Sequence, residues 1–198
     1  MSHDRSVRYA YIEPLDAIWL TVAARVGFKV NRSGDVYASS DGQGVISIGD
    51  AQTLDPDDCL AQMILHELCH SMVEGHQSLT KPDWGLDNET ARDEARELAC
   101  VRLQAALAGE YGLRRVLAPT TEFRAAYDAL PADPMCGGSD PSIELAQLGL
   151  SRAREAPWGP HLHAGLRATR GLLRIAKDFG ARDPRAGPAP LWEALDPS

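Results

Sequence analysis

The sequence predicts an α+β fold in which a small, mostly antiparallel sheet near the N-terminus packs against helices. Short β-prone runs separated by turn residues lie between residues 28 and 48, and apolar residues recur at helical spacing over much of the remaining chain. The 198 residues are 44% hydrophobic and 24% charged, which is typical of a globular protein. We expect one domain over residues 1–180 and a Pro/Gly-rich tail over 181–198.

The first elements follow from local patterns. Pro14 precedes apolar residues at helical spacing, and Gly27 marks the end of that helix. Three β-prone runs come next, and turn compositions at 32–34 and 41–44 separate them. The runs are 28–30, 35–38 and 45–48. These patterns predict a largely antiparallel sheet.

Helices are expected over most of the remaining chain. Asp55 and Pro56 predict the start of a helix that runs to Glu74, with Gly75 as its stop. A second long helix is expected over 87–108, because its alanines and leucines suit close helix packing. Further helices are expected at 121–130, 141–156 and 160–179, with Asp140 capping the second of these.

The segment His66-Glu67-Leu68-Cys69-His70 has the pattern HExxH within the first long helix. Residues four apart lie on one helix face, so both imidazoles can reach one metal ion. Glu67 is rotated by about 100° from His66, which places it beside the ion rather than on it. The pattern predicts a zinc site with His66 and His70 as ligands and Glu67 as general base.

Eighteen residues separate His70 from Glu89, which lies in the segment Asn88-Glu89-Thr90-Ala91-Arg92-Asp93. This HExxH-x18-E spacing resembles that of the gluzincins, the superfamily of thermolysin and the zinc aminopeptidases, and Trp84-Gly85-Leu86-Asp87 resembles their aromatic approach to the glutamate. The resemblance implies a zincin-like fold, Zn²⁺ as cofactor, Glu89 as third ligand and Asp93 as a hydrogen-bond acceptor for a ligand histidine. The G-x-M-E-N motif of the aminopeptidases is absent, so their specificity for amino termini is not implied.

Other assignments stay open. The compact ImmA-like peptidases, which the chain also resembles, pair HExxH with an acidic residue before an alanine-rich helix, so Asp93-Glu94 competes with Glu89 for the metal. A fourth protein ligand, such as Cys69 or His76, would instead indicate a structural zinc site or a module that captures a peptide without cutting it. The candidates for stabilising an oxyanion are His163, His161, Tyr127 and Tyr111.

The sequence therefore predicts zinc-dependent hydrolysis of a peptide or protein substrate, in which Glu67 takes a proton from a zinc-bound water. A net charge of -8 argues against nucleic acid as a partner. The absence of a signal peptide or a long apolar segment predicts a cytoplasmic protein without membrane contact. We expect the four cysteines to be free thiols.

Overall fold

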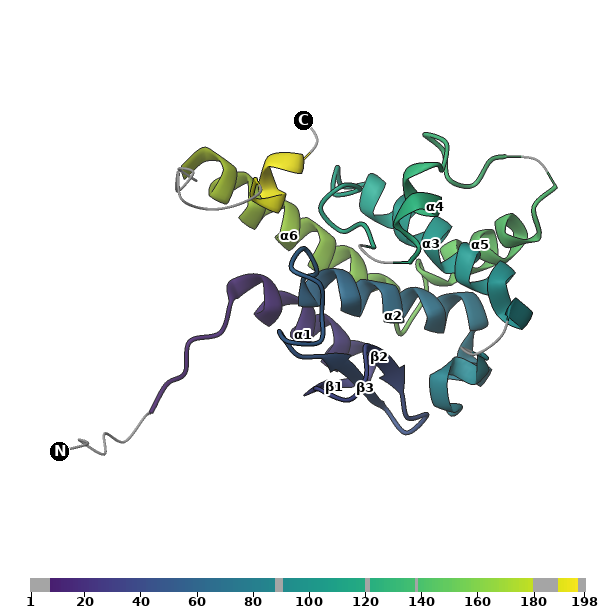
Figure 1. Ribbon diagram of the computed structural model, residues 1–198, viewed down its shortest axis with the longest axis horizontal. Coiled ribbons are helices and arrows are strands. Elements are labelled where there is room, and N and C mark those ends of the chain that lie inside the picture. The colour runs from purple at the N-terminus through teal and green to yellow at the C-terminus, as the bar shows by residue number, and fades with distance from the viewer. Residues whose placement is uncertain (1–7, 88–90, 120–121, 138, 180–188, 196–198) are drawn as a thin grey trace.

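The helix α2 (Leu60–Glu74), which carries the HExxH pattern, lies at the centre of an α+β fold (Figure 1). This computed structural model describes residues 8–87, 91–119, 122–137, 139–179 and 189–195. Within these residues there are six α-helices and one three-stranded sheet. α2 contacts α1, α3, α5 and strand β3, so most of its surface is buried.

The remaining elements have the following bounds. The other α-helices are α1 (Pro14–Val26), α3 (Glu94–Gly109), α4 (Arg124–Asp128), α5 (Pro141–Arg152) and α6 (Gly159–Phe179). The strands are β1 (Lys29–Ser33), β2 (Ala38–Ser40) and β3 (Val45–Gly49). Short 3₁₀ turns are η1 (His76–Ser78), η2 (Pro82–Gly85), η3 (Ala91–Asp93) and η4 (Leu191–Ala194).

The sheet is mixed, which corrects the expectation of a mostly antiparallel one. Its order is β1-β3-β2, with β3 antiparallel to β2 and parallel to β1. β3 takes the central position because its Ile46 and Ile48 are fully buried, whereas β1 is largely exposed. Of the two predicted turns, only the one at 41–44 connects the strands of a hairpin, β2 and β3. There the Asp41 carboxylate accepts hydrogen bonds from the amides of Gln43 and Val45.

The start of α2 differs from the expected one. α2 begins at Leu60, and Asp55 and Pro56 lie in a preceding turn, where the Asp58 carboxylate accepts a hydrogen bond from the amide of Asp55. Cys59 is the N-cap: its Sγ accepts from the amide of Gln62, and the Gln62 side chain accepts from the amide of Cys59. The expected end of the helix is confirmed.

The other helices agree with the sequence in position and differ at their ends. α1 ends as expected at Gly27, whose φ of 114° is left-handed. α3 begins at Glu94 after the turn η3, later than the expected residue 87, and residues 88–90 lie outside the described residues. Asp140 caps α5 as expected, by accepting a hydrogen bond from the amide of Ser142 at 2.9 Å.

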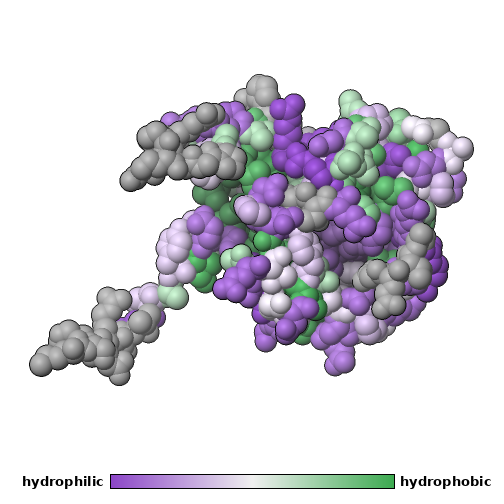
Figure 2. Space-filling model, in the orientation of Figure 1, coloured by the Kyte–Doolittle hydropathy of each residue, from purple (hydrophilic) through white to green (hydrophobic). Residues whose placement is uncertain are grey.

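One hydrophobic core joins α1, α2, α3, β3, α5 and α6, and it extends to Leu195. The turn η4 packs against α6, where the Lys177 ammonium donates to the Leu195 carbonyl at 3.1 Å. At the other end, residues 8–13 are exposed and stand away from the body, whose visible face is mostly hydrophilic (Figure 2). Within the described residues, no helix has the length and apolar character needed to cross a membrane.

Asp140 supports a test of the packing around α3. Its carboxylate caps α5 and pairs at 2.8 Å with the guanidinium of Arg102, which is 8% exposed. We expect Asp140→Ala to lower the free energy of unfolding by about 2–3 kcal/mol, because a cap is lost and a buried cation loses its charged partner. Urea unfolding measures this, and Asp128→Ala, in the exposed Arg124–Asp128 pair, is the control.

The same variant has a defined pH dependence. A hydrogen bond from the Ser142 side chain, together with Arg102 and the Ser142 backbone amide, holds the pKa of Asp140 below its ordinary value of 3.8. A carboxylate with a lowered pKa stabilises the fold above its ordinary pKa, and this contribution disappears as pH falls through the folded-state pKa. The stability difference between wild type and Asp140→Ala should therefore shrink in acid. A difference that is independent of pH would contradict the assignment.

Candidate metal site

α2 brings its two histidines to one face, as the HExxH spacing requires. The Nε2 atoms of His66 and His70 lie 3.1 Å apart, and the two rings are nearly perpendicular. His66 is half-buried and His70 is buried. Two imidazole nitrogens at this separation can share one ion.

Gln104 of α3 determines which nitrogen of His66 is available. The Gln104 amide nitrogen donates to the carbonyl of Leu117 at 2.7 Å, so its Oε1 is free to accept. This Oε1 lies 2.9 Å from Nδ1 of His66, which must therefore carry the proton. Nε2 of His66 is then unprotonated and directs its lone pair toward His70, which is the tautomer that a metal ligand needs.

Glu97 of α3 provides a carboxylate on the same side. Its Oε2 lies 3.5 Å from Nε2 of His70, and its side chain is 18% exposed. Burial raises the pKa of Glu97, while the nearby His66 acts in the opposite direction. A partly buried carboxylate thus lies beside His70, where it could serve as a further ligand.

Cys100 is the other group within reach. Ligand atoms of His66, His70 and Cys100 all lie within 4.8 Å of one another, so these three residues could hold a metal ion. The Sγ of Cys100 lies 3.9 Å from Nδ1 of His66, the nitrogen that Gln104 engages, and it donates to the His66 carbonyl. Burial raises the pKa of this thiol well above its ordinary value when no metal is bound.

The electrostatics of the site favour a bound cation. Burial, with a contribution from His66, lowers the pKa of His70 to about 3, so its imidazole is neutral at neutral pH. Burial raises the pKa of Glu67, while His70 and a hydrogen bond from Trp84 oppose this rise. A divalent ion at this site would place a positive charge beside the carboxylates of Glu67 and Glu97.

The structure leaves one predicted ligand untested and corrects the role of its neighbour. Glu89 lies outside the described residues, so its assignment stays a prediction. Among the described contacts, Asp93 accepts no hydrogen bond from either motif histidine. Its Oδ2 accepts from the side chain of Arg92 at 2.9 Å and from the amide of Asp87 at 2.8 Å. Gln104 Oε1 instead accepts the supporting hydrogen bond from His66.

The expected oxyanion donors make contacts elsewhere. The Tyr127 hydroxyl donates to the carbonyl of Arg114 at 2.7 Å and belongs to a small cluster with Val101 and Ala105. His163 lies on α6, where its Nδ1 is 2.9 Å from the Tyr111 hydroxyl. His161 is half-buried on the same helix. Among the described contacts, none joins these four side chains to the HExxH residues. The His76 ring meets the Trp158 ring in an edge contact, with 4.7 Å between centroids.

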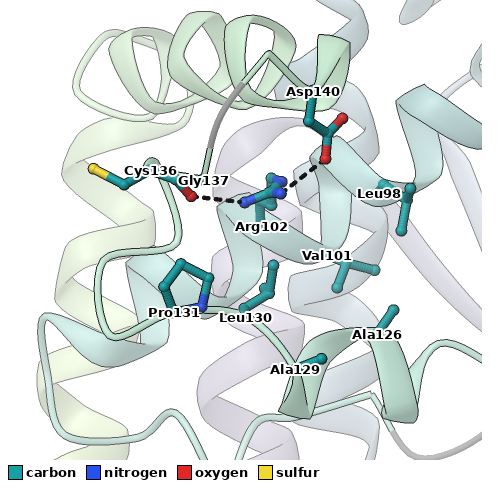
Figure 3. Close-up of a pocket in the computed structure, with 10 residues that line it drawn as sticks. All are labelled: Leu98, Val101, Arg102, Ala126, Ala129, Leu130, Pro131, Cys136, Gly137 and Asp140. Atoms are coloured by element: carbon teal, nitrogen blue, oxygen red, sulfur yellow. Dashed lines mark hydrogen bonds and ion pairs between the residues drawn. The ribbon is translucent and has the colours of Figure 1, made fainter.

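A cavity of about 320 Å³ lies on a different face of α3 (Figure 3). Its walls include Leu98, Val101 and the guanidinium of Arg102, which is held between the Cys136 carbonyl and Asp140. The Cys136 thiol points away from the cavity (Figure 3). None of the predicted site residues lines it, so we place the candidate site at the histidines.

Sequence reasoning missed Glu97 and Gln104, although the chain holds a signal for both. With Cys100 they occupy positions i, i+3 and i+7, which form one stripe on a helix rich in alanine and leucine. A polar stripe at that spacing on a buried helix indicates a polar partner opposite.

Comparisons with protein-family models, with curated proteins and with solved structures found no match for this chain. The function of the chain is therefore inferred from the geometry of its site.

Gln104 provides a test of that geometry. We expect Gln104→Ala to lower the affinity for Zn²⁺ or Co²⁺ by about 10–100-fold, because His66 loses the acceptor that fixes its tautomer. Competition with a chromophoric chelator measures the affinity. Gln147→Ala, on the exposed side of α5, is the control. An unchanged affinity in Gln104→Ala would show that the tautomer does not depend on this bond.

Proposed function

We propose that the chain is a zinc-dependent peptidase whose ion is held by His66, His70 and Glu97, with Glu67 as general base. The observation that supports this most is a pair of short separations between ligand atoms: Nε2 of His66 lies 3.1 Å from Nε2 of His70, and Nε2 of His70 lies 3.5 Å from Oε2 of Glu97. The general base of the motif lies next to this group in the sequence.

The donor set suits zinc. Nitrogen and oxygen ligands at about 2.0–2.1 Å from a tetrahedral ion lie about 3.3–3.4 Å from one another, and the two separations given above bracket this value. Two imidazoles and one carboxylate are also the ligands of catalytic zinc in several peptidases, which leave a fourth position for water. In this set Glu97 has the role that the sequence resemblance implies for Glu89.

The chemistry assigns a role to each of these side chains. Bound zinc lowers the pKa of a coordinated water to about 7 and polarises a peptide carbonyl. Glu67 would then accept the proton of the attacking water and deliver it to the leaving amine. Gln104 keeps Nε2 of His66 unprotonated throughout.

A second candidate is a structural zinc site without catalysis. It is favoured by the proximity of Cys100, since a fourth protein ligand would close the coordination shell. The two candidates differ in whether a water or the thiol fills the last position. The absorption spectrum of the Co²⁺-loaded protein separates them, because thiolate ligation produces an intense charge-transfer band in the near ultraviolet.

The third ligand is tested by a pair of variants. We expect Glu97→Ala to lower zinc affinity by more than about 100-fold, which is beyond the effect of losing a supporting residue. Glu89→Ala should change it little. Isothermal titration with Zn²⁺ measures both. The reverse pattern would reinstate Glu89 as the ligand and contradict the assignment of Glu97.

The general base is tested by Glu67→Gln. This variant should keep bound zinc and lose peptide hydrolysis by at least about 10²–10⁴-fold, because the amide cannot accept the water proton. A mixed library of quenched fluorescent peptides measures the rate, and metal analysis confirms loading. Hydrolysis at the wild-type rate by the zinc-loaded variant would reject the mechanism.

A further inference from the structure

The turn η2 brings a tryptophan to the general base. Trp84 is 3% exposed, and its indole Nε1 donates to Oε2 of Glu67 at 2.9 Å. Among the described contacts, the Glu67 carboxylate accepts a hydrogen bond from Trp84 alone, and only its Oε2 takes part. The bond joins the base to a segment outside both metal-binding helices.

The backbone of η2 is strained where it presents this side chain. Asp83 and Trp84 have φ of 45° and 59°, and they are the non-glycine residues with positive φ in the described part of the chain. Bulky side chains disfavour this left-handed region, and such strain persists where the surroundings over-determine it. Consecutive left-handed residues therefore indicate that the position of Trp84 is imposed by its contacts.

The sheet supplies those contacts. The amide of Ser40 in β2 donates to Oδ1 of Asp83 at 3.0 Å, and Phe28 meets the Trp84 ring edge-on, with 5.4 Å between centroids. Gly42, in the turn between β2 and β3, lies so close to η2 that an added Cβ would be 2.6 Å from the carbonyl carbon of Lys81. The edge of the sheet thus holds η2 in place against α2.

The N–H group of a buried indole needs a hydrogen-bond acceptor, and a neutral hydroxyl group is sufficient for this. Trp19 donates to Thr169 and Trp158 to Ser71, each at 2.9 Å, and both acceptors are neutral. Trp84 donates instead to a carboxylate that burial makes costly to ionise. A hydrogen bond to an ionised acceptor is stronger and fixes its orientation more firmly.

We propose that Trp84 is a positioning residue for Glu67, whose indole N–H holds Oε2 and leaves Oε1 directed at the reacting water. This proposal rests on the proposed function and identifies the group that orients its general base. The bond also keeps Glu67 from binding the ion directly. Without it, the Glu67 carboxylate, which is next to His66 in the sequence, would be free to compete with Glu97 as a ligand. The sheet, through η2, thereby sets the geometry of the reaction.

The bond itself is tested by NMR of the full chain without metal or substrate. The four tryptophans give four indole N–H signals, and Trp84→Phe assigns the signal of Trp84 by its disappearance. In Glu67→Ala this signal should move upfield and exchange faster with solvent, while the signals of Trp19 and Trp158 stay in place. A Trp84 signal that does not respond to Glu67→Ala would overturn the proposal, whether or not the protein cuts peptides.

The consequence is tested by kinetics on one peptide selected from the library. Trp84→Phe should lower kcat by about 10–100-fold, as for other supporting hydrogen bonds, with KM and zinc affinity within about twofold of wild type. Trp158→Phe, which removes a buried indole donor to Ser71 on the same helix, is the matched control and should keep its kcat. An unchanged kcat in Trp84→Phe, or a loss matched by loss of zinc, would overturn the positioning role.

Discussion

Burial of charge between α2 and α3 is the constraint on which the rest of the site depends. Glu67 and Glu97 are both carboxylates for which burial raises the pKa, and the neighbouring His70 is kept neutral by the same burial. Such a group is costly in a low-dielectric interior unless a cation or protons compensate it. Trp84 donates a hydrogen bond to Glu67, and Gln104 accepts one from His66. Both bonds orient the group without neutralising it, so a bound cation would be electrostatically favourable there.

The surrounding packing keeps the two helices at the distance that this site needs. α5 fits closely against both, because Gly149 leaves room that an added Cβ would fill at 2.7 Å from a methyl of Leu103. At the end of α2 the Arg152 guanidinium donates to the carbonyls of Met72 and Val73, which satisfies acceptors left free at a helix terminus. The helix that holds the histidines is thus fixed along its length.

The sequence predicted the local parts of this arrangement and missed those that depend on tertiary register. The HExxH helix, its end at Gly75 and the cap at Asp140 follow from nearest neighbours along the chain, and the structure confirms them. The approach of Glu97 to His70 depends on how α3 is rotated against α2, which spacing along the chain does not encode. Likewise, β3 is the central strand because its Ile46 and Ile48 are buried in the core, and the turn residues at 32–34 and 41–44 do not indicate this position.

α3 is held on two faces at once. On one face Gln104 binds His66, and around the helix Arg102 is anchored by Ser142, the Pro134 carbonyl and Asp140. The helix cannot turn about its axis without breaking charged hydrogen bonds on its far side. The positions of the candidate ligands are therefore set by the protein framework itself, so an ion bound at the proposed site would spend little of its binding energy on ordering the chain.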